Sequence, residues 1–172
     1  MGIIQLVENG RLDFGLVGMT TDSSELVFIP FLEDELVIVT PVTPHYLELA
    51  ARKASLEALL DEPFILRENG SGTKKAIDRY LEERHIPTGA LNVVARMNDL
   101  EAVKRSIING LGISILSAKS VQDLKISRQV LIFPLDDPAP TRSLYIVYKK
   151  EHALLPHVRR FIQFVRNYYQ PQ

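Results

Sequence analysis

Hydrophobic and polar positions along this chain alternate between the period of a helix and the period of a strand. Ile3, Leu6 and Val7 share one helical face, and Gly10 is placed to end that helix. The pattern then predicts strands at residues 13–18, 26–32, 35–40, 64–67, 92–97, 112–116, 130–135 and 143–149. It also predicts helices at residues 55–60, 73–84, 99–109 and 118–124, and a last helix from Pro156 that buries Val158, Phe161, Ile162, Val165 and Tyr168 or Tyr169.

Strands that alternate with helices favour an α/β fold with mainly parallel sheets. Pro30 interrupts the second strand, which indicates an edge strand or a bend. Residues 41–45 form a proline-punctuated link, and residues 129–134 are a second candidate connection. Together these two segments predict that the chain crosses twice between two lobes.

The composition is that of a soluble globular protein: 172 residues, 46% hydrophobic and 24% charged. A net charge of −1 argues against a surface dedicated to nucleic acid or to a membrane. The chain has no cysteine, which fits a cytoplasmic setting and excludes disulfides and a thiol nucleophile. Its first residues lack the basic flank of a signal peptide, and no apolar run approaches the roughly 20 residues that span a bilayer.

Catalytic and metal chemistry find little support in the sequence. The four histidines are scattered, without the spacing of a metal site: His45, His85, His152 and His157. Ser71 lies between glycines but lacks the flanking pattern of a nucleophile elbow. The acidic run at residues 33–35 is expected to be a solvated turn. We therefore expect no catalysis, no metal and no cofactor.

Residues 64–73 predict a small receptor for an anion. An apolar strand ends at Arg67, a turn with Asn69 and Gly70 follows, and a helix begins near Thr73. A helix start presents free backbone N–H groups and the positive end of its dipole to an anion. The Arg67 guanidinium and the hydroxyls of Ser71 and Thr73 would complete a site for carboxylate, sulfate or phosphate. The alternative is that Ser71 or Thr73 caps the helix and Arg67 lies on the surface.

Further polar positions follow predicted strands, where ligands of α/β proteins gather. Residues 18–21 follow one strand, Thr40 ends another, and Asn98 separates a strand from a helix. Each is also explained by a turn or a helix cap. The candidate set is Gly18, Met19, Thr20, Thr21, Thr40, Arg67, Ser71, Gly72, Thr73 and Asn98.

Several blocks in this order resemble the effector-binding domain of LysR-type transcriptional regulators. They are residues 6–17, 35–41, 62–73 and 103–114, then the strand at 144–148 and the helix that ends with residues 161–164. Each block is weak alone, but together they cover nearly the whole chain. The resemblance implies a bilobal periplasmic-binding-protein-like (type II) α/β fold, in which crossing strands join two Rossmann-like lobes. Residues 1–40 and 130–172 would form lobe I, and residues 41–129 lobe II.

The resemblance further implies a cytoplasmic sensor that binds a small effector in the cleft between the lobes, at the ten candidate positions above. The Arg-Glu-x-Gly-Ser-Gly-Thr version at residues 67–73 is similar to members that sense small anionic metabolites, including regulators of sulfur assimilation and carbon fixation. The full regulator would be a homo-oligomer, a dimer or tetramer, and would bind DNA through a helix-turn-helix that this chain lacks.

The chain departs from the family pattern at its start, because a strand, a helix and a strand normally precede what is residue 1 here. Lobe I is therefore expected to be incomplete, with unpaired sheet edges that favour self-association. Two other function classes remain open at this point. One is the solute-binding receptor of an uptake transporter, and the other is an enzyme on the same fold, such as a transferase or dehydratase.

Overall fold

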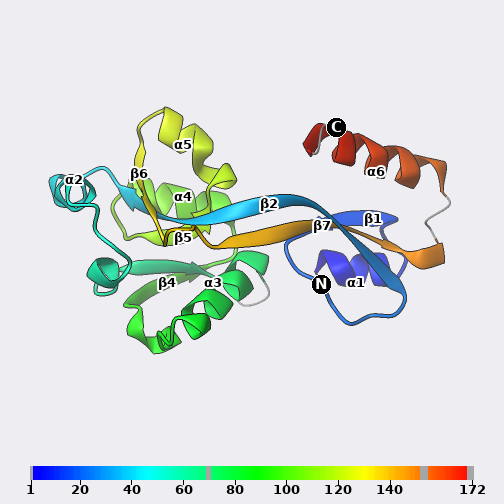
Figure 1. The fold of residues 1–172 in the computed structure, drawn as a ribbon, viewed down its shortest axis with the longest axis horizontal. Coiled ribbons are helices and arrows are strands. Elements are labelled where there is room, and N and C mark those ends of the chain that lie inside the picture. Colours follow the sequence, from blue (N-terminus) through cyan, green and yellow to red (C-terminus); the bar gives the residue numbers. More distant parts are fainter. Residues whose placement is uncertain (1, 69–70, 152–154, 170–172) are drawn as a thin grey trace. The chain divides into compact units, whose positions relative to one another are not determined.

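A computed structural model describes residues 2–68, 71–151 and 155–169. The chain divides into two compact units: unit 1 comprises residues 1–33 and 142–172, and unit 2 comprises residues 34–141. Figure 1 shows the elements along the chain. In order they are α1 (Ile3–Glu8), β1 (Phe14–Val17), β2 (Leu26–Pro41), α2 (Pro44–Ala51), β3 (Phe64–Arg67), α3 (Gly72–Glu83), β4 (Val93–Met97), α4 (Leu100–Ile108), β5 (Ser114–Ser117), α5 (Gln122–Ile126), β6 (Val130–Pro134), β7 (Thr141–Lys149) and α6 (Pro156–Tyr169).

Unit 1 is a small sheet covered by one helix on each face. β7 lies between β1 and the first half of β2, and β1 pairs antiparallel with β7 from Phe14↔Tyr148 to Val17↔Tyr145. Successive residues of β7 point to opposite faces. Ile146 and Tyr148 pack with α6, whereas Val147 packs with Val7 of α1. The two helices therefore bury opposite faces of the same strand (Figure 1).

Unit 2 is built on a second sheet around the last residues of β2. β2 pairs antiparallel with β5 through residues 36–39 and with β6 through residues 37–41. β3 pairs parallel with β4, and a parallel bridge from Phe64 to Ile113 joins β3 to the segment that leads into β5. The strands of unit 2 thus follow one another in the order β4, β3, β5, β2, β6.

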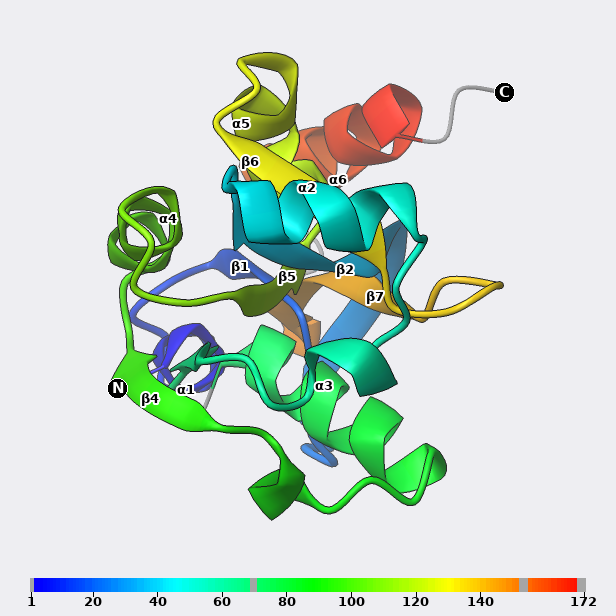
Figure 2. The ribbon, with the colours of Figure 1, turned by 90° about the vertical axis from the view of Figure 1, so that its left-hand side faces the viewer.

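Two hydrophobic clusters cover the two faces of this second sheet. One unites Ile38, Phe64 and Ile115 with residues of α2 and α3, and the other unites Val39 and Ile65 with residues of α4 and α5. Figure 2 shows α3 and α4 on different sides of β5. Burial is continuous along β5 and along the first three residues of β3, as expected for strands that lie between two helical layers.

Most predicted elements are confirmed within a few residues, but three differences have a physical cause. The two strands predicted at residues 26–32 and 35–40 are one strand, β2, from Leu26 to Pro41. In its first half the only described neighbour of β2 is β7, so proline, which lacks an N–H, is tolerated at an edge. The prediction of mainly parallel sheets is wrong, because β1–β7, β2–β5 and β2–β6 are antiparallel.

The third difference concerns helices. The predicted proline link contains the start of α2, where Pro44 occupies the first turn and the Thr43 hydroxyl accepts a hydrogen bond from the backbone N–H of Tyr46 at 3.4 Å. The helix expected at residues 55–60 is only a short 3₁₀ turn, Glu57–Leu59. In α6, Val158 and Val165 are buried as expected, but Tyr168 is 68% exposed and Tyr169 is 43% exposed.

The compact units do not share the limits of the two predicted lobes. Unit 2 begins at Asp34 and ends at Thr141, whereas lobe II was expected at residues 41–129. Residues 36–40 and 130–134 belong to unit 2 because they pair within its sheet. The lobes as functional parts of the molecule stay a prediction.

Candidate functional site

The carboxyl ends of β3 and β4 meet the start of α3 within unit 2. Arg67 ends β3 and pairs with Met97, the last residue of β4. The backbone N–H of Glu68 donates to the Met97 carbonyl at 3.2 Å, so the two chains remain adjacent beyond the strands. Because β3 and β4 are parallel, both release their following loops at the same edge of the sheet.

Arg67 is half-buried at this edge, and its Nε atom is buried without a hydrogen-bond partner among the described residues. Ile65, two positions earlier in β3, packs in the cluster formed with α4 and α5. By strand alternation, the Arg67 side chain leaves the sheet on that same face. A buried N–H donor without a hydrogen-bond partner is energetically costly. The Arg67 guanidinium is therefore a candidate to donate a hydrogen bond to a bound ligand.

The start of α3 is the second part of this site. Ser71 is the N-cap residue, with φ −74° and ψ 132°, and its side chain makes no capping hydrogen bond. Lys75 donates its backbone N–H to the Ser71 carbonyl at 3.1 Å, so the preceding N–H groups of the first turn have no acceptor within the helix. Gly72 is the first helical residue, and Thr73 is 8% exposed. Asn69 and Gly70 of the predicted turn lie outside the described residues.

Asn98 follows β4 at the same edge and is exposed. The sequence left open whether it caps the next helix. The structure assigns that role to Asp99, whose carboxylate accepts a hydrogen bond from the Ala102 N–H at 2.7 Å. The amide of Asn98 is therefore not the cap of α4.

Thr40 lies at the other end of the unit 2 sheet. Its neighbour Val39 pairs with Ser114 at the start of β5, whereas Ser117 at the end of β5 pairs with Leu36. Thr40 is 0% exposed, and its hydroxyl donates to the Pro41 carbonyl at 3.2 Å. Since Ile113 bridges to Phe64, Thr40 is about 10 Å from the level of Arg67 along the strands. The structure does not bring these two predicted residues together.

Two residues that the sequence analysis did not select lie at the Arg67 end of the sheet. The Ser117 hydroxyl donates to the Asp34 carboxylate at 2.7 Å and accepts a hydrogen bond from the Ser120 N–H at 3.2 Å. Asp34 is only 1% exposed, so the prediction of a solvated acidic turn is wrong for this residue. The sequence held no signal for its burial, because an acidic run usually lies in solvent.

Residues 18–21 belong to unit 1, in the connection that follows β1. Gly18 and Met19 are half-buried, and Thr20 and Thr21 are exposed. A Cβ atom on Gly18 would lie 3.1 Å from Nη1 of Arg142, so the guanidinium of Arg142 passes close to this glycine.

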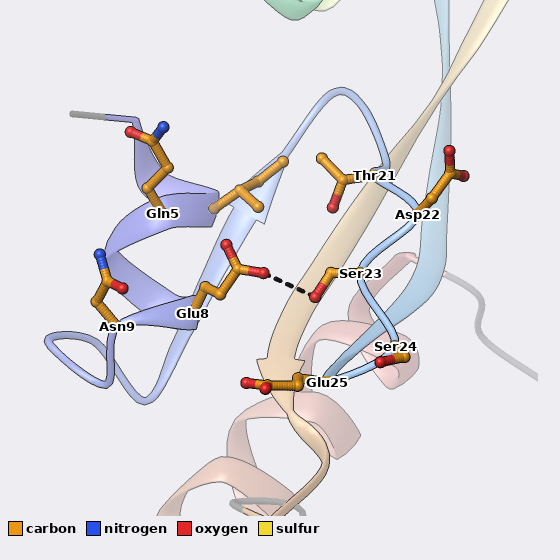
Figure 3. A pocket seen from close by; sticks show the side chains of 9 residues that line it. Gln5, Glu8, Asn9, Thr21, Asp22, Ser23, Ser24 and Glu25 are labelled. Carbon is orange, nitrogen blue, oxygen red and sulfur yellow. Dashed lines mark hydrogen bonds between the residues drawn. The ribbon is translucent and has the colours of Figure 1, made fainter.

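Unit 1 also contains a pocket of about 840 Å³ between α1 and residues 21–25 (Figure 3). Thr21 is the one predicted site residue in its lining. The Ser23 hydroxyl donates to the Glu8 carboxylate at 2.7 Å across it. The lining consists of Ile4, Gln5, Glu8, Asn9, Thr21, Asp22, Ser23, Ser24 and Glu25. Three carboxylates and no cation make it unsuitable for an anion.

The described residues include neither a candidate metal centre nor a helix that could span a membrane. The part of the chain that the structure describes contains no group of three or more histidine, cysteine or acidic side chains placed to hold a metal ion. Among those same residues, no helix has the length and apolar character needed to cross a bilayer. His152 lies outside them.

Comparison with known proteins identifies the fold. A family model described as LysR substrate binding domain matches residues 1–170. The regulatory domain of CcmR from Synechocystis PCC6803, solved in complex with 2-PG, has a TM-score of 0.80 and 25% identity over 98% of this chain and 78% of that one. The effector-binding domain of QuiR, in complex with shikimate, has a TM-score of 0.79 and 22% identity over 97% and 76% of the two chains. These likenesses confirm the predicted periplasmic-binding-protein-like (type II) α/β fold.

A curated relative shows in what kind of protein a similar domain occurs. The uncharacterized HTH-type transcriptional regulator YeiE of Escherichia coli strain K12 is 32% identical over 163 residues. The match covers 94% of this chain and 53% of that protein, so the chain spans about half the length of this relative. The family match over almost every residue and this relative agree with the resemblance seen in the sequence: the chain belongs to the LysR substrate-binding-domain family, the effector-binding part of a class of transcription regulators.

Proposed function

We propose that the end of β3 and the start of α3 bind the anionic group of a small metabolite, and that this binding is the sensing step of a transcription regulator. The observation that carries the proposal is the Nε atom of Arg67, buried and without a hydrogen-bond partner among the described residues. A bound oxyanion supplies the acceptor that this donor lacks. A charge-assisted hydrogen bond of this kind is stronger than one between neutral groups.

The start of α3 supports the same ligand class. The N–H groups of its first turn and the uncommitted Ser71 hydroxyl are donors, and the positive end of the helix dipole favours a negative charge. The ligands named for the CcmR and QuiR domains, 2-PG and shikimate, are small anions. We infer the class of effector from these two lines and leave its identity to experiment.

The proposed site also includes the other predicted contacts. Asn98 is available at the same edge because Asp99 caps α4. Thr40 is fully buried at the opposite end of the unit 2 sheet, so its contribution requires a change in its surroundings. The participation of residues 18–21 and the placement of the effector in a cleft between lobes stay predictions.

The test is a comparison of Arg67→Ala with Arg79→Ala, which removes the same charge from an exposed position later in α3. We expect shikimate, 2-PG or sulfate to raise the melting temperature of the wild-type chain, because a ligand of the folded state stabilises it. Arg67→Ala should weaken binding about 10-fold or more, the equivalent of one charged hydrogen bond. Arg79→Ala should bind as the wild type does. An equal rise in both variants would contradict the role of Arg67.

We further propose that the complete protein is a cytoplasmic, DNA-binding homo-oligomer that uses no cofactor. The support is the family and the HTH-type relative, of which this chain matches about half. Relatives of this kind favour a regulator over the receptor of an uptake transporter. Footprinting of the full-length protein on its own promoter, with and without the effector, tests this. A footprint that the effector leaves unchanged would argue against sensing.

A further inference from the structure

Helix α3 is fastened to residues 135–140, the segment that joins β6 to β7. The Tyr80 hydroxyl donates to the Leu135 carbonyl at 3.1 Å, and both residues are buried. One turn later Arg84, the C-cap residue of α3, forms an ion pair with Asp136. The guanidinium of Arg84 also lies over the Tyr80 ring, with Cζ 5.8 Å from the ring centroid. We call Tyr80, Arg84, Leu135 and Asp136 the α3 anchor.

Residues 135–140 are in turn connected to β2 and β7. The Pro140 carbonyl accepts a hydrogen bond from the Leu36 N–H of β2 at 2.9 Å, and β7 begins at the next residue, Thr141. The chain passes between unit 1 and unit 2 in these two strands, since the limits of the units lie at residues 33–34 and 141–142. The α3 anchor therefore connects the helix to both strands at the point where they leave unit 2.

The other end of α3 belongs to the proposed anion site. The helix begins at Gly72, after the N-cap Ser71, and runs for 12 residues. A helix of this length is about 18 Å long, so Arg84 and Asp136 do not contact a ligand at its first turn. Ala76, Ile77 and Leu81 are buried in the cluster that also contains residues of the sheet, which keeps the helix in one piece on its support. A displacement of the first turn is therefore carried to the last.

The α3 anchor combines a permanent contact with one that can be released. The hydrogen bond from Tyr80 to Leu135 is buried, and its loss would leave a buried polar group without a partner. The side chains of Arg84 and Asp136 are 42% and 30% exposed, and an ion pair with this access to water is weak. A small movement of α3 thus changes the ion pair while the helix stays packed on its sheet.

We propose that α3 transmits effector binding to β2 and β7 through the α3 anchor. The inference rests on the proposed function, because the movement begins when an anion draws the first turn of α3 towards Arg67. The ion pair makes residues 135–140 follow the other end of the helix, and the hydrogen bond between Pro140 and Leu36 passes the movement to β2. A ligand shifts such an equilibrium only as far as it favours one arrangement, so the effect should depend on an occupied site.

Hydrogen–deuterium exchange of the full-length regulator tests this inference, with shikimate, 2-PG and sulfate as probes. In the wild type, a probe that binds should slow exchange at the first turn of α3 and change exchange at residues 135–141 and at Leu36. Arg84→Ala should keep the first effect and lose the second. Its affinity for the probe should be unchanged or higher, because coupling is reciprocal and the ligand no longer has to move the strands.

Three further variants separate transmission from damage to the fold. Asp136→Ala should behave as Arg84→Ala does. The double variant Arg84→Asp with Asp136→Arg should restore the change at residues 135–141, since it rebuilds the ion pair with the charges exchanged. Arg79→Ala removes an exposed arginine of the same helix and should respond as the wild type does. A merely structural role would instead lower the melting temperature and weaken binding together.

Two results would overturn the inference and leave the anion site in place. One is a wild type in which a probe protects the first turn of α3 but leaves residues 135–141 unchanged. The other is an Arg84→Ala variant in which both segments still respond. If no probe protects the first turn, or if the protection survives Arg67→Ala, the proposed site itself is wrong and the inference falls with it.

Discussion

Single residues show that the chemical type of a side chain does not determine whether it is buried in this protein. Arg67 lies at the end of β3, where its sequence context predicts it, but the burial of its Nε atom follows from the layers around the strand. Asp34 is the opposite case. It belongs to an acidic run that resembles a surface turn, and it is buried with Ser117 as a hydrogen-bond partner. A residue's type indicates what it can bind, while its neighbours in space decide whether it is available.

Gly112 illustrates a constraint that operates on one atom. A Cβ atom at this position would lie 2.3 Å from the Pro63 carbonyl oxygen, which itself accepts the Ile113 N–H at 2.7 Å. Because the close atom belongs to the backbone, Gly112→Ala must separate the starts of β3 and β5. We expect a loss of about 1–3 kcal/mol in the free energy of unfolding, measured in urea, as for overpacked cores.

Gly89→Ala is the matched control, since no heavy atom lies within 4 Å of its added Cβ. It should change the stability by less than about 0.5 kcal/mol, as surface substitutions usually do. If the two alanine variants were equally stable, the close approach at Gly112 would have no energetic role.

At the scale of elements, helix boundaries follow local signals closely. α1 ends before Gly10, whose φ is +67°, and α4 ends before Gly110, whose φ is +77°. Both positions are in the left-handed region that glycine enters at little cost. The start of α2 was missed, although Thr43 and Pro44 form a cap and a first-turn proline, because the prolines alone suggested a link.

The start of α4 allows a direct comparison of two neighbouring residues. Asp99 accepts a hydrogen bond from the Ala102 N–H at 2.7 Å, whereas Asn98 does not cap the helix. Asp99→Ala should therefore lower the free energy of unfolding by about 1 kcal/mol. Asn98→Ala should leave stability nearly unchanged and weaken effector binding. Chemical denaturation of both variants measures the difference, and an equal loss of stability would remove the distinction.

For the whole molecule, two compact units share the long strand β2, and each buries its own core.

The stability of unit 2 depends on pH through Tyr46, which is 7% exposed and donates its hydroxyl hydrogen to Glu62 at 2.7 Å. Burial, followed by the hydrogen bond and the charge of Glu62, raises the pKa of Tyr46 above its ordinary value of 10.0. Burial likewise raises the pKa of Tyr80.

The folded state favours the neutral phenol, and this sets the direction in which the free energy of unfolding changes with pH. The stabilisation is complete below the unfolded pKa of about 10 and is lost as the pH rises above that value toward the folded pKa. The free energy of unfolding should therefore fall above about pH 10. Tyr46→Phe should flatten this fall, whereas Tyr168→Phe, at an exposed position, should not. Thermal melts between neutral and alkaline pH measure both slopes, and identical slopes in the two variants would contradict the assignment.

The sequence by itself determined most helices and strands, the family, and the position of Arg67 at the end of a strand. These features depend on periodicity, caps and glycines that act within a few residues of one another. Tertiary structure alone decided the continuity of β2 through Pro30, the burial of Asp34, the exposure of Tyr168 and the separation of Thr40 from Arg67. Each of these depends on which distant segments pack together, because burial and strand pairing are set by neighbours in space rather than in the chain.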